Sequence, residues 1–184
     1  MKHSQGFSLI EVLLTIALVS SSLLGMLKLQ SISIQYTQAA VQRNAAMNLA
    51  YELVEIMRAH RHELLRRSTT PSEAVSLLAS TVVYQANGRL KVSGAGCAAQ
   101  TLAQSLSEQL ECWFEKVKTY LPSASELRDF FVVCPSYKLD ADARPVCADS
   151  SYRGVNLGIQ LAWRSQNSLC GESDMCIYTT QVAL

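Results

Sequence analysis

One carboxylate stands inside a segment that is otherwise apolar enough to cross a membrane. Glu11 comes five residues after Gly6 and lies within the apolar run from Phe7 to Leu27. An ionised side chain at hydrocarbon depth costs several kcal/mol unless an opposite charge pairs with it. The sequence therefore indicates that a positively charged group pairs with Glu11 in the functioning protein.

The six cysteines are the second group whose chemistry the sequence suggests. An even number of cysteines is typical of oxidising compartments, where they form disulfides. No two of them form a CxxC pair, so zinc-ribbon and thioredoxin-like sites have little support. We therefore expect an exported chain.

Spacing suggests which cysteines pair. Two pairs flank short polar loops, and each bridge could stabilise the fold by about 2–3 kcal/mol: Cys134–Cys147 and Cys170–Cys176. This leaves Cys97 and Cys112. If a helix begins near Gln100, Cys112 lies roughly 18 Å along its axis, and the segment from Cys97 must fold back almost taut. The third pairing is therefore possible but strained.

No pattern of enzyme chemistry is present. The sequence lacks GxSxG, HExxH and a phosphate-binding glycine loop, so no catalytic residue is assigned. His60 and His62 are two apart on an expected helix, so they would point roughly 200° from each other and could not share a metal. Asp140 and Asp142 lack the further oxygen ligands of a calcium loop, and a solvated turn explains them better. We expect no metal and no cofactor.

Positive charge is gathered at one place only. The formal net charge is +1, so no overall field indicates a nucleic-acid partner. A cluster of arginines could contact DNA or lipid headgroups: Arg58, Arg61, Arg66 and Arg67. Cations near the C-terminal end of a long helix also complement its dipole, and this is the simpler interpretation. Nucleic acid is therefore not expected as a partner.

The N-terminal segment has the length of a membrane span. Phe7 to Leu27 is about 21 residues, or roughly 30 Å as a helix, which matches the hydrocarbon thickness. A cleavable secretory signal, with Lys2 as its basic region and Ser20–Ser22 at its cleavage site, is the rival interpretation. Glu11 inside the apolar core argues against it. We expect a retained single span with the basic N-terminus inside and the body outside.

The helical pattern continues beyond the span. Apolar residues recur at spacings of three, four or seven over Leu29–Leu64, the stripe of an amphipathic helix. No proline precedes Pro71, so one helix over Phe7–Arg66 is expected. Between Leu29 and Tyr51 it carries one charge, Arg43. This composition fits a stalk that packs against other helices better than a solvated tether.

The heptapeptide from Gly6 to Val12, GFSLIEV, resembles the processing site and anchor of the type IV prepilin family. Two further stretches, 23–30 and 50–61, resemble the PilV branch of minor pilins. Lys28 and His60 depart from that branch, which has a small residue and an asparagine there. Together these stretches cover about the first third of the chain.

The resemblance implies cleavage after Gly6 by a dedicated peptidase and N-methylation of Phe7. Cleavage would turn the Phe7 amide into a free amine, and methylation would keep its positive charge. Phe7 and Glu11 are four apart and share one helix face. Glu11 could then pair with its own amine or with that of a neighbouring subunit. An intermolecular pair would fix the axial register between helices.

The remaining chain is expected to form helices followed by strands. Thr70–Glu73 is typical of a helix start, for a short helix to about Ala79. A second amphipathic helix has apolar residues over Leu102–Leu121 and ends at Pro122, with Trp113 as a core anchor rather than a binding platform. Ser93–Gly96 marks a loop, Asn87-Gly88 a turn, and the expected strands are Thr81–Gln85, Phe130–Cys134, Leu157–Arg164 and Cys176–Leu184.

This order predicts an α+β fold. An antiparallel sheet of three or four strands would lie on the C-terminal half of the stalk helix. A long N-terminal helix packed against a small sheet is also what the pilin resemblance implies. The expected organisation is a cleaved leader (1–6), a transmembrane or filament-core anchor (7–29), a helical stalk (30–66) and an exported, disulfide-containing globular head (67–184).

The resemblance implies a structural, non-enzymatic minor pilin that primes or modifies type IV pilus assembly, within a tip complex, and supports motility, adhesion or DNA uptake. The implied partners are other minor pilins, the major pilin, the prepilin peptidase, the inner-membrane assembly platform and, before assembly, the lipid bilayer. The implied location is the inner membrane, with the N-terminus cytoplasmic and the head periplasmic, and then the pilus. A minor pseudopilin of a type II secretion system is the closest alternative, and a membrane-anchored DNA- or surface-binding module is less favoured.

Overall fold

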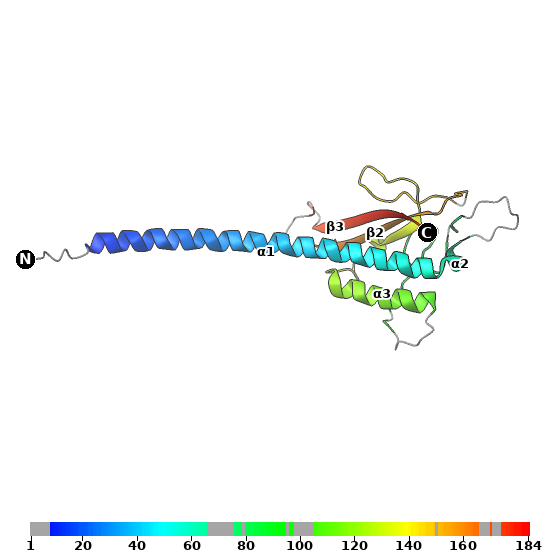
Figure 1. Ribbon diagram of the computed structural model, residues 1–184, viewed down its shortest axis with the longest axis horizontal. Helices are drawn as coiled ribbons and strands as arrows, with labels where there is room; N and C mark the ends of the chain where they lie inside the picture. The colour runs from blue at the N-terminus through cyan, green and yellow to red at the C-terminus, as the bar shows by residue number, and fades with distance from the viewer. Residues whose placement is uncertain are drawn as a thin grey trace, which may run out of the picture. The chain divides into compact units, whose positions relative to one another are not determined.

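The computed structural model describes residues 8–65, 76–78, 80–94, 96–97, 105–149, 151–165, 170 and 174–184. The chain divides into two compact units, Met1–Ala40 and Val41–Leu184. Figure 1 labels the elements along the chain, whose bounds are α1 Leu9–Ala59, α2 Arg61–Leu64, α3 Leu106–Tyr120, a 3-10 helix η1 Arg128–Phe130, β1 Val132–Pro135, β2 Asn156–Arg164 and β3 Met175–Ala183.

The first helix ends earlier than the sequence predicts. α1 stops at Ala59, His60 leaves the helical region with φ −111° and ψ 26°, and α2 adds a single short turn. Leu64 is fully buried, and its carbonyl accepts the N–H of Leu78 at 2.9 Å. The expected continuous helix to about Arg66 is therefore wrong in its last turns, because the chain bends to bury Leu64 and pair with the 76–78 segment.

The second long helix is confirmed, but its start is later than expected. α3 begins at Leu106 because Ser105 caps it: the Ser105 hydroxyl accepts the N–H of Glu108, and the Glu108 carboxylate accepts the N–H of Ser105. These two bonds satisfy donors that the first helical turn leaves free. The expected start near Gln100, together with Leu102, lies outside the described residues. Trp113 is a core anchor as predicted, with 1% of its side chain exposed.

Three of the four expected strands form one antiparallel sheet in the order β1-β2-β3. The expected start of the first at Phe130 is wrong, because Phe130 belongs to η1 and β1 begins at Val132. Gln160 of β2 lies opposite Val132 of β1 and opposite Thr179 of β3. The prediction of a fourth strand over Thr81–Gln85 is wrong, because only an isolated bridge between Tyr84 and Leu90 forms there.

The turn that follows Tyr84 is confirmed. Gly88 has φ +82°, a left-handed conformation that glycine adopts without cost, and its N–H donates to the Gln85 carbonyl at 2.9 Å. The described residues of the Ser93–Gly96 segment form a loop, as expected. The Thr70–Glu73 helix start lies outside the described residues. Residues 76–78, which the same prediction places in a helix, are not helical.

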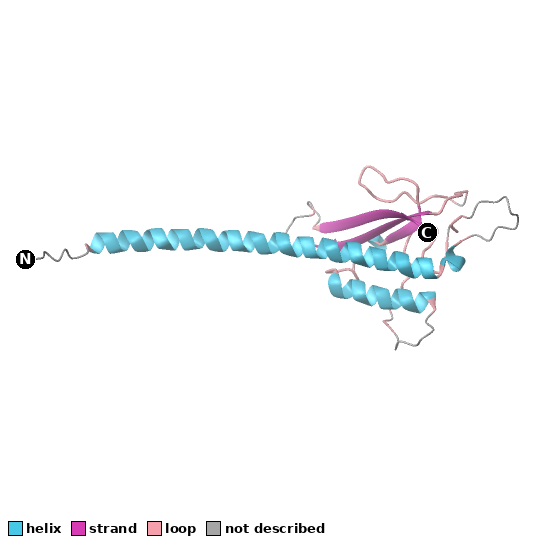
Figure 2. Ribbon diagram, in the orientation of Figure 1, coloured by secondary structure: helices cyan, strands magenta, loops and turns pink. Residues whose placement is uncertain are grey.

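The core of the second unit combines α1, α3 and the sheet, which confirms the α+β fold. α1 contributes one buried stripe, Ala46, Leu49, Ala50, Leu53, Val54 and Met57. Trp113 of α3 donates its indole N–H to the Leu49 carbonyl at 2.9 Å, and Trp163 of β2 donates to the Gln42 side chain at 3.2 Å. Figure 2 shows α3 and the sheet on different sides of the C-terminal part of α1.

Candidate functional site

The structure describes only part of the processing motif, because the description of the chain begins at Ser8. Gly6 and Phe7 lie outside the described residues, whereas Glu11 lies in the first turn of α1. The Ser8 carbonyl accepts the N–H groups of Glu11 at 3.0 Å and Val12 at 3.3 Å, which closes that turn. A carboxylate in the first turn favours the helix, because it faces the positive end of the helix dipole.

The Glu11 carboxylate is exposed, and the ion pairs found among the described residues do not include it. Glu11 is also the single acidic residue of the sequence before Glu52. Within an apolar segment such a carboxylate is costly unless an opposite charge pairs with it.

The N-terminal part of α1 presents apolar side chains to its surroundings. α1 is long and apolar enough, by length and composition, to cross a membrane, and none of its most apolar window is buried within the chain. The exposed large apolar side chains up to residue 29 are Leu9, Ile10, Val12, Leu13, Leu14, Ile16, Leu18, Val19, Leu23, Leu24, Met26, Leu27 and Leu29. Such a surface needs lipid or other apolar helices around it.

Hydroxyl groups of this helix find acceptors on the helix itself. Thr15 donates to the Val12 carbonyl at 2.8 Å, Ser21 to the Leu18 carbonyl at 2.9 Å, and Thr37 to the Ser33 carbonyl at 2.9 Å. A hydroxyl that is satisfied by its own helix can enter an apolar environment at little cost. Thr15 and Ser21 are therefore compatible with a span, and Glu11 and Lys28 are the charged side chains of the 7–29 anchor.

The structure joins the six cysteines in three pairs, the two that spacing suggested and the pair that was left, Cys97–Cys112. The Cα–Cα separations are 4.3 Å for Cys97–Cys112, 5.4 Å for Cys134–Cys147 and 4.9 Å for Cys170–Cys176. Since α3 starts at Leu106, Cys112 lies only about 9 Å along its axis, half the distance assumed from the sequence. The expected helix start near Gln100, on which the argument for strain in that pair depended, was therefore wrong.

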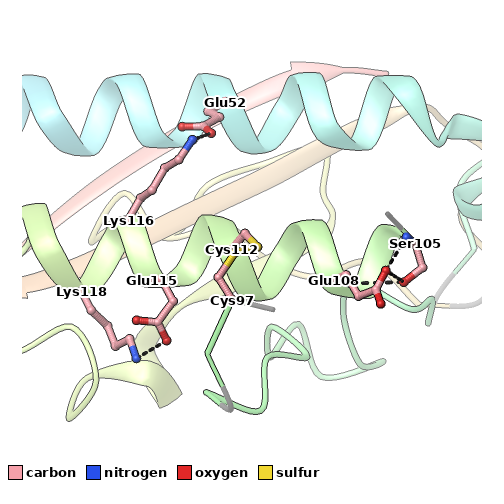
Figure 3. Close-up of a disulfide and its surroundings, with 8 residues drawn as sticks. All are labelled: Glu52, Cys97, Ser105, Glu108, Cys112, Glu115, Lys116 and Lys118. Atoms are coloured by element: carbon pink, nitrogen blue, oxygen red, sulfur yellow. Dashed lines mark hydrogen bonds and ion pairs between the residues drawn. A yellow bond between two sulfur atoms is a disulfide. The ribbon is translucent and has the colours of Figure 1, made fainter. Parts of the chain in front are cut away.

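The Cys97–Cys112 bridge lies on α3 beside polar contacts that hold this helix in place (Figure 3). Lys116 of α3 pairs with Glu52 of α1, and the Glu111 carboxylate accepts the backbone N–H groups of Ser93 and Gly94, the latter at 2.9 Å. The bridge and the Glu111 contacts both tie the 93–97 loop to α3. Sequence periodicity gave no signal for the Glu111 contacts, because they depend on a loop conformation.

Two pairs of potential metal ligands, His60 with His62 and Asp140 with Asp142, are among the described residues. The break at His60 brings the His60 and His62 rings within 6.3 Å of each other, so the argument that a straight helix separates them was wrong. Within the described residues, however, no group of three or more His, Cys, Asp or Glu side chains could hold a metal ion. Asp140 instead accepts the N–H groups of Asp142 at 3.0 Å and Arg144 at 2.8 Å, which makes it a turn residue.

Two ionisable groups of the second unit are shifted by their surroundings. Burial raises the pKa of Tyr84, whose hydroxyl donates to the Leu78 carbonyl at 2.9 Å. Hydrogen bonds from the Ser151 hydroxyl and backbone N–H lower the pKa of Asp149. Both shifts belong to turn and core contacts rather than to a reactive cleft.

Of the arginines near the end of α1, Arg58 makes contacts within the second unit. Arg58 pairs with Glu55 at 2.7 Å and also donates to the Ala183 carbonyl at 3.3 Å. Arg66 and Arg67 lie outside the described residues. The Ala183 contact ties the end of α1 to the end of β3, a connection that sequence patterns did not reveal.

The comparisons with known proteins concern the N-terminus. Residues 1–27 match the family model described as the prokaryotic N-terminal methylation motif. The matched range includes Gly6, Phe7 and Glu11 and the apolar residues as far as Leu27. No curated protein and no solved structure matches the chain.

Proposed function

We propose that this chain, whose N-terminus carries the type IV prepilin methylation motif, is a structural minor pilin: a single-pass, membrane-anchored subunit that helps to prime or modify type IV pilus assembly. The observation that carries the proposal is the match over residues 1–27, because it contains both the processing site and Glu11. The exposed apolar surface of α1 supports it, since a filament core or a bilayer can cover that surface.

The chemistry starts at the Gly6–Phe7 peptide bond. The prepilin peptidase adds water across this amide, which leaves a carboxylate on the leader at Gly6 and an amine on Phe7. In N-methylation the amine nitrogen then attacks the methyl group of an electrophilic methyl donor, the bond between that methyl group and the donor breaks, and the nitrogen loses one proton to solvent and remains basic. Processing thus creates a positive charge four residues before Glu11, at a spacing that places both groups on one helix face.

Glu11 then acts as the register group of assembly. A carboxylate paired with the Phe7 amine of a neighbouring subunit loses most of the cost of leaving water, whereas an unpaired one keeps it. Only one axial position of the two helices brings the charges together. Pairing therefore selects that position, as a buried polar group does in other helical assemblies.

The same anchor chemistry applies to the minor pseudopilins of type II secretion systems, which share the motif and the general architecture. The methylation motif supports a pilin-like or pseudopilin subunit equally, and the PilV-like stretches at 23–30 and 50–61 are the reason to favour the pilus. A tip location, other minor pilins and the major pilin as neighbours, and an orientation with the second unit outside the cytoplasm complete the proposal.

Exchange of Glu11 tests the register role. Glu11→Ala should leave membrane insertion unharmed or improved, because a charge is removed from the apolar segment. Cleavage should proceed, because the Gly6–Phe7 bond is untouched. What should fail is docking, so the mature protein should accumulate in the membrane and be absent from sheared pili. Glu11→Asp should be intermediate, because its shorter side chain keeps the charge but reaches less far.

A matched control exchanges the other charge of the segment. Lys28→Ala removes a charge from the same helix without touching the amine–carboxylate pair, and the variant should enter filaments. Normal incorporation of Glu11→Ala into sheared pili would show that the carboxylate does not set the register.

A further inference from the structure

The two edges of the sheet differ in how their backbone groups are used. At the β1 edge, the Val133 N–H donates to the Gly88 carbonyl at 2.8 Å, and the Pro135 carbonyl accepts the Ala148 N–H at 2.7 Å. Both outward-facing residues of β1 are thus paired, and proline has no N–H to offer. The β1 edge is therefore closed by the protein itself.

The β3 edge is arranged differently. The Ser165 backbone N–H donates to the Asp174 carbonyl at 2.8 Å, and the Leu184 backbone N–H donates to the Val155 carbonyl at 3.1 Å. Together with the strand register, these two bonds determine which β3 residues form hydrogen bonds with β2. Every second residue between them faces β2, so the N–H and C=O groups of the alternate residues point away from the sheet. These outward-facing residues are Met175, Ile177, Thr179, Gln181 and Ala183.

Among the described residues, no backbone group outside the β2–β3 pairing forms a hydrogen bond with the backbone of Met175, Ile177, Thr179 or Gln181. The Ala183 carbonyl accepts a hydrogen bond from the Arg58 guanidinium. The outward-facing row is partly or fully exposed. β3 also lacks the usual protection of an edge strand, because Met175–Ala183 contains no proline and no charged residue.

We propose that the free edge of β3 binds an extended segment of a different protein chain, which adds a fourth strand to the sheet. An extended backbone is the chemical group that matches alternate N–H and C=O groups at the strand period, and addition to an exposed edge is an established mode of peptide recognition. The proposal rests on the proposed function in one respect, namely that the subunits of one filament all point in the same direction.

Side chains and charges along the edge define the segment that fits. Tyr178 and Val182 lie on the core side of the sheet and are partly buried, so apolar side chains beside them would be covered. Thr179 and Gln181 are polar and lie on the other face. Arg58 lies at the Ala183 end of the edge, and Asp174 lies at its Met175 end. Because Glu55 already pairs with Arg58, the charges at the Ala183 end offset each other. The matching segment is therefore amphipathic, apolar beside Tyr178 and Val182 and polar beside Thr179 and Gln181.

A second copy of the chain is not the occupant. Two β3 edges could in principle pair with each other in antiparallel fashion. However, contacts from Gln42 to Trp163 and from Arg58 to Ala183 show that α1 and β3 run in the same direction within the second unit. Such a pair would therefore run the Val41–Ala59 segments of the two copies in opposite directions, whereas the subunits of one filament share one direction. Pairing of β3 with the β1 edge of another copy is blocked, because that edge is occupied.

Photo-crosslinking in cells that assemble the full chain tests the proposal. A benzophenone amino acid at Gln181, and in a second experiment at Ile177, should give an adduct with one other protein. The crosslinked positions in that protein should shift by about four residues within one segment, as a paired strand requires. Adduct yield should fall about tenfold or more in Thr179→Pro, because proline removes an outward N–H and adds a ring at the edge.

The matched controls separate pairing from folding. Thr179→Val keeps the N–H and a similar shape, so its adduct yield should equal that of the unmodified chain. Thr179→Lys leaves the backbone intact but adds a charge that discourages edge pairing, so it should also lose the adduct and decides the matter if the proline variant fails to fold.

A self-adduct, the absence of any adduct, or an adduct that persists undiminished in Thr179→Pro and Thr179→Lys would overturn the proposal. The mass of the mature N-terminus, measured on the same cells, reports on the proposed function separately.

Discussion

The contact between Trp113 and α1 gives the sharpest stability prediction. Trp113→Phe removes the indole N–H that donates to the Leu49 carbonyl at 2.9 Å, and it leaves space in a site where 1% of the tryptophan is exposed. The lost hydrogen bond is worth about 1 kcal/mol, and the smaller ring costs roughly 1–2 kcal/mol more. The Leu49 carbonyl keeps its bond within the helix, so no buried acceptor is orphaned. We expect a loss of about 2–3 kcal/mol.

Two matched variants frame this value. Trp163→Phe also shrinks a buried ring, but its N–H donates to the side chain of Gln42, which can turn toward water, so the loss should be smaller, roughly 1–2 kcal/mol. Tyr120→Phe changes an exposed ring on α3 and should alter stability by less than about 0.5 kcal/mol.

Pulse proteolysis in urea measures these differences on the full chain in detergent micelles, because cleavage reports the unfolded fraction of the second unit. A loss for Trp113→Phe no larger than that for Tyr120→Phe, or smaller than that for Trp163→Phe, would refute the reasoning about the α1–α3 contact.

Three further predictions concern the second unit. Non-reducing peptide mapping should recover the three intrachain bridges, whereas free thiols throughout would contradict them: Cys97–Cys112, Cys134–Cys147 and Cys170–Cys176. Ser105→Ala should cost about 1 kcal/mol in the same urea assay, because it removes the cap of α3, and an unchanged midpoint would contradict the capping role. Burial raises the pKa of Tyr84, so the folded protein holds the phenolic proton more tightly than the unfolded chain does. The contribution of this group to the free energy of unfolding is therefore complete below about pH 10 and declines as the pH rises through the folded-state pKa. Tyr84→Phe, which loses the bond to Leu78, should be less stable than the parent near pH 7 yet show a smaller decline between about pH 10 and pH 12, and equal declines in both proteins would contradict this assignment.

The parts of the fold that follow from periodicity were predictable. β2 and β3 agree with the predicted Leu157–Arg164 and Cys176–Leu184 strands to within a residue or two, because alternation of apolar side chains reflects a half-buried strand. α3 was identified for the same reason, since its apolar residues recur at helical spacing. The prepilin-type N-terminus was visible because its signal is contained in one short stretch.

The parts that depend on tertiary contacts were not predictable. The early end of α1 at Ala59 follows from the burial of Leu64, which the sequence does not distinguish from any other leucine at a helical position. Helical periodicity could not place the start of α3, because apolar residues continue on both sides of Ser105. The free edge of β3 required the register of the sheet, since the alternating pattern of a strand is the same at an edge and in the centre.

The most direct test of the central claim is the mass of the mature N-terminus. Intact-protein and peptide mass spectrometry on the protein isolated from membranes should find a chain that begins at Phe7 and carries one methyl group on its amine. A chain that retains Met1–Gly6, or one that begins near Leu23 as a cleaved secretory signal would leave it, would contradict the prepilin account.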